Sequence, residues 1–119
     1  MYNKVFLIGR LVRDPEMRLS PSGIAITRFT IAIDKPSKKE NQEQSADFIR
    51  IVAFRRLAEI CNDYLKKGRL VSIEGKLQIS SYEKDGEQKT SAEIIADNMQ
   101  ILDRHTSNEK NSNETQTSN

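Results

Sequence analysis

The strongest constraint on the fold is a change of hydrophobic period within residues 46–59, ADFIRIVAFRRLAE. Residues 46–54 alternate with a period of two, which predicts a β-strand. After it, Leu57, Ile60, Cys61 and Tyr64 recur at i, i+3, i+4 and i+7, which predicts an amphipathic helix over residues 55–67 with these four on its apolar stripe. The fold must therefore join a half-buried strand directly to a helix.

Alternating apolar segments predict further strands in the rest of the chain. They cover residues 3–12, 24–34, 69–82 and 89–102, with a short strand at 17–19. The first of them is apolar on both alternating faces, as expected of a strand that is covered on two sides. Asp85-Gly86 predicts a tight hairpin turn.

Gly75 interrupts the fourth long strand and predicts a bulge or a sharp bend there. The alternation of this strand places the apolar side chains Val71, Ile73, Leu77 and Ile79 inward. Its polar face, which includes Tyr82, is expected to point outward.

The order of the long elements is three strands, one helix and two strands. An all-β chain of five strands with one α-helix between strands three and four has the layout of an OB-fold barrel. We expect one such domain over residues 1–102. Residues 35–45 are predicted to form a flexible charged loop, and residues 103–119 a disordered polar tail, because neither segment can build a core.

One face of the strand at 46–54 carries Phe48, Arg50, Val52 and Phe54. Single-stranded nucleic acid exposes flat bases and a charged backbone, so it is bound by aromatic platforms with cations beside them. Tyr82 offers a third aromatic platform. The alternative that both phenylalanines are core residues stays open, although the opposite face of the strand is already apolar.

Several cations border the face that the OB-fold layout would use for its ligand. Arg56, Lys66 and Lys67 lie at the predicted helix ends, and Lys35 begins the loop before the strand. Side chains at such positions are more often simply solvated than bound to phosphate. The net charge of +2 is too small to indicate nucleic acid by itself.

Catalysis, metal binding and membrane insertion have little support in the sequence. The single histidine, His105, lies in the predicted tail, and the single cysteine, Cys61, lies on the apolar stripe of the helix. We expect no enzyme activity, no cofactor and no metal site. No secretory signal and no apolar run of about 20 residues is found, so we expect a cytoplasmic protein without a membrane partner.

Residues 1–102 resemble the bacterial single-stranded DNA-binding protein (SSB) family. The resemblance is carried by NKVFLIGRLVRDPEMRLSPSGIAITRFTIAID, with its G-R-L-x-R-D-P-E-x-R turn, and by ADFIRIVAFRRLAEICNDYLKKGRLVSIEGKL. It implies an OB-fold that assembles into a homotetramer and binds single-stranded DNA without strong sequence preference. Protection of single strands during replication, recombination, repair or DNA uptake is the implied role.

The resemblance also implies roles for individual residues of this chain. Phe48, Phe54 and Tyr82 match base-stacking positions of the family, and Arg50, Arg56, Lys66 and Lys67 match phosphate-binding positions. Lys4, Arg18 and Arg28 match further basic positions, and Lys35 is added from its place beside the face. The chain ends in NETQTSN instead of an acidic tip that closes with Pro-Phe, so recruitment of replication or repair proteins through such a tip is not expected.

Two other function classes compete with DNA binding. An OB-fold can be an interaction module whose exposed aromatics bind another protein. It can also carry a nuclease or another enzyme, which would need acids clustered at one end of the barrel.

Overall fold

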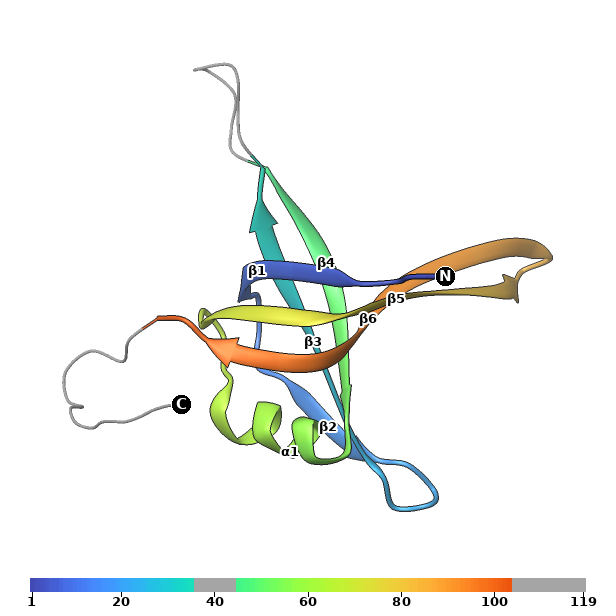
Figure 1. Cartoon of the computed structure of the whole chain (residues 1–119). Coiled ribbons are helices and arrows are strands. Elements are labelled where there is room, and N and C mark those ends of the chain that lie inside the picture. The colour runs from blue at the N-terminus through green and yellow to red at the C-terminus, as the bar shows by residue number, and fades with distance from the viewer. Residues whose placement is uncertain (36–44, 104–119) are drawn as a thin grey trace.

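A computed structural model describes residues 1–35 and 45–103 (Figure 1). Its elements are β1 (Val5–Leu11), β2 (Glu16–Leu19), β3 (Ala25–Asp34), β4 (Ala46–Phe54), α1 (Arg55–Tyr64), β5 (Leu70–Lys84) and β6 (Glu87–Ile101). Residues 36–44 of the predicted loop at 35–45 and residues 104–119 of the predicted tail at 103–119 lie outside the described residues.

Five of the strands form a closed ring. They follow one another in the order β1-β5-β6-β4-β3, and β1 closes the ring by pairing with β3 at Arg10–Ala32 and Leu11–Ile31. β2 adds a short strand beside β3. The β3–β4 ribbon crosses β1, β5 and β6 steeply (Figure 1). This five-stranded ring with one helix between β4 and β5 confirms the predicted all-β OB-fold.

Glycine permits the close approach of strands where the ring closes. A Cβ atom added at Gly9 of β1 would lie 2.5 Å from the carbonyl oxygen of Ala32 in β3. Any larger residue would therefore push the two strands apart at a seam that has only two residue pairs. The absence of a side chain at Gly9 keeps the ring closed.

The core fills the ring and is covered at one end by α1. β3 turns Phe29 and Ile31 inward and Arg28 outward, as its alternation predicts. Thr27 of the same strand is polar and buried, and its hydroxyl donates a 2.7 Å hydrogen bond to the carbonyl of Ala58 in α1. This bond fixes the helix over the end of the barrel.

The helix ends earlier than predicted. It stops at Tyr64, because Leu65 leaves the helical conformation with ψ of 152° while its N–H still donates to the Cys61 carbonyl. The buried stripe is Ala58, Cys61 and Leu65, whereas Tyr64, predicted on the stripe, is exposed. Gly68 has φ of 90° and belongs to the turn that leads to β5.

The far halves of β5 and β6 leave the barrel as a two-stranded arm (Figure 1). Pairing between β1 and β5 ends at Val5–Gly75, and the register of β5 against β6 shifts between Glu74 and Gly75, as the predicted bulge requires. The prediction that Leu77 and Ile79 point into the core is wrong, because beyond Gly75 no other strand covers them and both are exposed. Asp85 and Gly86 form the predicted turn at the tip, with φ of 54° and 78°.

The first strand is open on one side within a single chain. Val5 and Leu7 pack against the core, but Phe6 is 62% exposed and Ile8 is also exposed. The expectation of a strand covered on two sides is therefore not met by this chain alone.

Asp103 anchors the end of the described chain to the barrel. Its carboxylate accepts a 3.2 Å hydrogen bond from the backbone N–H of Leu70 and lies 3.5 Å from Arg10 and 3.7 Å from Arg69. The sequence places this residue at the start of the tail, but these contacts join it to the ordered domain.

Candidate nucleic-acid interface

Strand β4 presents two aromatic rings and a cation on the outer surface of the barrel. Phe48 is 65% exposed, Phe54 is 38% exposed, and Arg50 between them is exposed. The alternative that these rings form the core is wrong, because the buried residues of β4 are Ile51, Val52 and Ala53. The open surface is nonetheless interrupted, since Val52 in the same row is only 1% exposed.

The neighbouring strands place cations on the same face as these rings. Across β2, β3 and β4 the register aligns Arg18 with Ile26 and Ile26 with Phe54. Arg28 is paired in the same way with the buried Val52. Paired residues in a sheet point to the same side, so Arg18 and Arg28 share the outer face of Phe54.

Four of the predicted phosphate-binding cations form ion pairs within the chain. Lys4 lies 3.4 Å from Glu74, Arg28 3.9 Å from Glu93, Lys35 3.5 Å from Asp47 and Arg56 3.2 Å from Glu59. All four are at least 40% exposed at the side chain, and ion pairs of this kind contribute only about 0–1 kcal/mol. A phosphate can therefore replace the carboxylate at low cost. Within residues 1–35 and 45–103, the other predicted cations, Arg18, Arg50, Lys66 and Lys67, form no ion pair.

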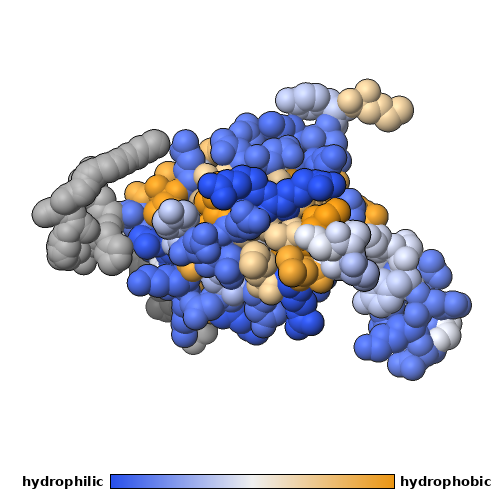
Figure 2. Space-filling model, turned by 90° about the horizontal axis from the view of Figure 1, so that it is seen from below, coloured by the Kyte–Doolittle hydropathy of each residue, from blue (hydrophilic) through white to orange (hydrophobic). Residues whose placement is uncertain are grey.

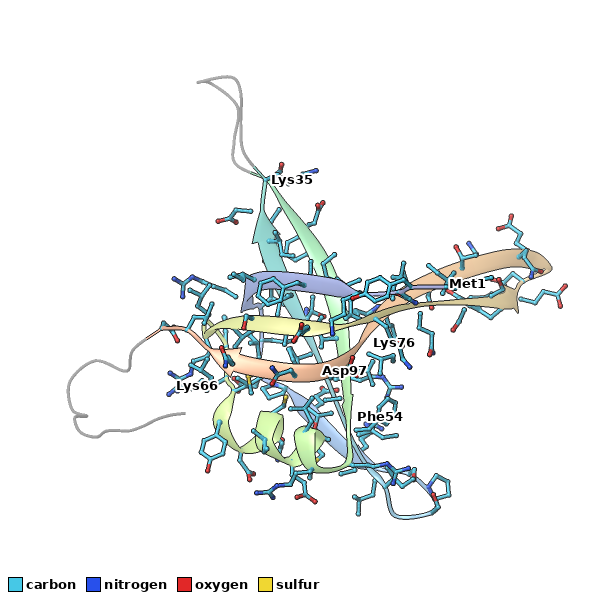
Figure 3. The ribbon with its side chains drawn as sticks, in the orientation of Figure 1. Met1, Lys35, Phe54, Lys66, Lys76 and Asp97 are labelled. Carbon is cyan, nitrogen blue, oxygen red and sulfur yellow. The ribbon has the colours of Figure 1, made fainter. Side chains whose placement is uncertain are left out.

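Not all predicted site residues lie together. Phe54 and Lys66 flank opposite ends of α1, and Lys35 lies at the far end of the β3–β4 ribbon (Figure 3). Tyr82 is exposed on the arm, paired with Lys89. The compact group consists of Phe48, Arg50, Phe54, Arg18 and Arg28, and we call it the β4 face.

The structure gives no support to a nucleophilic or metal-dependent reaction in the described part of the chain. Burial raises the pKa of the Cys61 thiol to about 12, so it stays a neutral thiol at physiological pH. Among the described residues no group of three His, Cys, Asp or Glu side chains is placed to hold a metal ion. The same residues include no helix long and apolar enough to cross a membrane.

Comparison with known proteins assigns the chain to a family. The model of the single-strand binding protein family matches residues 2–102. The chain belongs to this family. It is 43% identical over 117 residues to single-stranded DNA-binding protein 1 of Staphylococcus aureus strain Mu50, covering 98% of this chain and 72% of that protein.

Two further relatives agree with this assignment. The single-stranded DNA-binding protein of Thermotoga maritima is 47% identical over 106 residues, which cover 87% of this chain and 75% of that protein. The solved structure of the Plasmodium falciparum SSB complex with ssDNA has a TM-score of 0.78 and 27% identity, and the match covers 87% of this chain and 96% of that one. The single-strand binding protein fold therefore extends over the whole described domain.

Two hollows border the β4 face of this single-strand binding protein family member. One of about 380 Å³ is mostly apolar and is lined by Val5, Leu7, Ile49 and Leu77 together with Phe48. The other, of about 230 Å³, has a lining that is half polar and half apolar and includes Arg28, Arg50 and Glu93. Glu93 lines both hollows, and sequence patterns did not single it out. Its place beside β4 depends on the parallel pairing of β4 with β6, for which the sequence carries no local signal.

Proposed function

We infer that this protein binds single-stranded DNA without strong sequence preference, by stacking bases on Phe48 and Phe54 and neutralising phosphates with the cations beside them. The observation that carries this inference is the exposure of both rings and of Arg50 on one outer face of β4. Stacking contributes about 1–3 kcal/mol per base and tolerates any base, because every base has a flat face. The complex of the Plasmodium falciparum relative with ssDNA supports the same partner.

The remaining predicted residues extend the site beyond the β4 face. We assign phosphate contacts to Arg50, Arg18 and Arg28 on that face, and to Arg56, Lys66, Lys67, Lys4 and Lys35 around it. Tyr82 would stack a base at the arm. A backbone that passes these positions in turn would follow the outside of the barrel from β4 to the arm.

The exposed apolar side chains support assembly into a homotetramer. Phe6 and Ile8 are open on β1, and Leu77 and Ile79 are open on the arm. Together with the apolar hollow beside β1 they provide surface that a second chain would cover. Seen from the α1 end, the body carries apolar patches between hydrophilic side chains, while the arm is mostly hydrophilic (Figure 2).

The biological role that follows is protection of transient single strands in replication, recombination, repair or DNA uptake. The protein would act in the cytoplasm and by binding alone, without catalysis. The small net charge of +2 does not argue against this role, because the local cations on the binding face would provide the attraction.

Titration of a fluorescent oligo(dT) at several salt concentrations tests DNA binding. We expect tight binding that weakens steeply as salt rises, because bound phosphates release counterions. If the domain instead binds only other proteins, the titration would show no salt-sensitive DNA binding. An unchanged Kd in the double variant Phe48→Ala, Phe54→Ala would refute the stacking assignment. Light scattering tests assembly separately, with an expected mass of four times 13.6 kDa.

A further inference from the structure

The smaller hollow beside the β4 face carries equal numbers of positive and negative side chains. It lies between the segment joining β1 to β2 and strands β3, β4 and β6, and has a volume of about 230 Å³. Its charged lining comprises three arginines, Arg13, Arg28 and Arg50, and three carboxylates, Asp14, Glu16 and Glu93. Formal charges of opposite sign cancel over this lining, so beside the arginines assigned to phosphates the hollow also offers acceptors to the polar edge of a base.

Glu93 shares the lining of one hollow with Phe48 and of both hollows with Arg50. One residue after Glu93, Ile94 pairs with Ile51 in the parallel β4–β6 ladder, so the register places Glu93 beside Arg50. Phe48 is two residues from Arg50 along β4, a distance of about 7 Å on the same face. The carboxylate therefore lies within reach of the edge of a base that stacks on the Phe48 ring.

The Glu93 carboxylate retains acceptor capacity for such a base. Its Oε2 lies 3.9 Å from Nε of Arg28, which is too long for a hydrogen bond. The side chain is 25% exposed, so it is partly shielded from water and still accessible. An ionised carboxylate only accepts hydrogen bonds, and its natural partner on a base edge is an amino group.

We propose that Glu93 recognises the exocyclic amino group of the base stacked beside it, and so favours cytosine over thymine at this position. Cytosine presents an amino donor where thymine presents a carbonyl oxygen, which the carboxylate repels. Arg28 and Arg50 on either side keep the carboxylate from repelling the DNA backbone. This inference rests on the proposed binding of single-stranded DNA and adds a base preference to it.

The experiment compares the ratio of Kd for oligo(dT) to Kd for oligo(dC) of equal length in the wild type and in Glu93→Gln. Glutamine has the same shape but carries both a donor and an acceptor, so it pairs with either base. We expect the ratio to fall about fivefold in the variant, the equivalent of one lost amino contact. Differences in stacking between the two bases cancel, because they are the same in both proteins.

Glu87→Gln is the matched control. Glu87 lies on the same strand and is ion-paired with Lys89 at 3.5 Å, so its replacement also removes one negative charge and one ion pair. We expect its ratio to equal that of the wild type. A ratio unchanged in Glu93→Gln, or changed equally in both variants, would overturn the role of Glu93. Failure of the wild type to bind either oligonucleotide would instead refute the proposed function.

Discussion

Replacement of Phe54 by alanine separates base stacking from phosphate contact at the β4 face. Phe54 is 38% exposed, so one part of its ring is open to a base and the other part packs on the barrel. Loss of one stacked base costs about 1–3 kcal/mol, which raises Kd for oligo(dT) about 5- to 150-fold. The replacement removes no phosphate contact, so the slope of log Kd against log salt should stay the same.

The same replacement also affects stability. Truncation of a fully buried phenylalanine to alanine lowers the free energy of unfolding by about 3–5 kcal/mol. Because the Phe54 ring is only partly covered, we expect the free energy of unfolding to fall by about 1–3 kcal/mol. Binding must therefore be measured below the melting temperature of the variant. This temperature is determined by circular dichroism.

Fluorescence anisotropy of a labelled oligo(dT) at several salt concentrations gives both the affinity and the slope. Tyr64→Ala is the control, since Tyr64 is a 61% exposed ring on α1, away from the aligned row. We expect a parallel line displaced to weaker binding for Phe54→Ala, and superposition on the wild type for Tyr64→Ala. A Kd within twofold of the wild type, or a flattened slope, would refute stacking on Phe54.

Four further variants test charge, packing and backbone conformation. Arg50→Ala should lower the salt slope by about 1, because one phosphate contact is lost; an unchanged slope in the same titration would exclude that contact. Gly75→Ala should lower the free energy of unfolding by about 1–3 kcal/mol in urea denaturation, because its Cβ would overlap the carbonyl oxygen of Ile95; unchanged stability would contradict this close approach. Arg55→Gly should raise the free energy of unfolding by about 0.5–1 kcal/mol, because Arg55 has φ of 60°, a left-handed conformation that glycine adopts without strain. Arg56→Gly should lower the free energy of unfolding by about 1 kcal/mol, because glycine disfavours the helix there. A lower free energy of unfolding in both variants would contradict the left-handed conformation of Arg55.

Features that depend on neighbouring residues along the chain could be predicted from the sequence. Alternation in β3 places Phe29 inside and Arg28 outside, and the structure agrees, because side-chain direction along a strand is a local property. The Asp85-Gly86 turn is also correct, since both residues adopt the positive φ that this turn requires. The exposed rings of Phe48 and Phe54 belong to the same class of prediction.

Features that depend on which strand lies beside which could not be predicted in this way. Alternation predicts that Leu77 and Ile79 share a face with Val71. That this face is uncovered beyond Gly75 follows from the structure alone, because the pairing of β1 with β5 ends at Val5. Glu93 was missed for a similar reason. Its position beside Arg50 depends on a parallel pairing between strands that are about 40 residues apart in the chain.

We infer that the uncovered arm would link the proposed DNA binding to the proposed assembly. Tyr82 lies on the part of β5 that has left the barrel, and among the strands of residues 1–35 and 45–103 only β6 pairs with that part. A two-stranded ribbon alone is marginally stable, so the arm needs a further surface to hold Tyr82 at a fixed place. The exposed Leu77 and Ile79 at its base are the side chains that a second chain would cover. Assembly would then fix the stacking platform of the arm relative to the β4 face, and the length of DNA that one chain engages would depend on the presence of its neighbours.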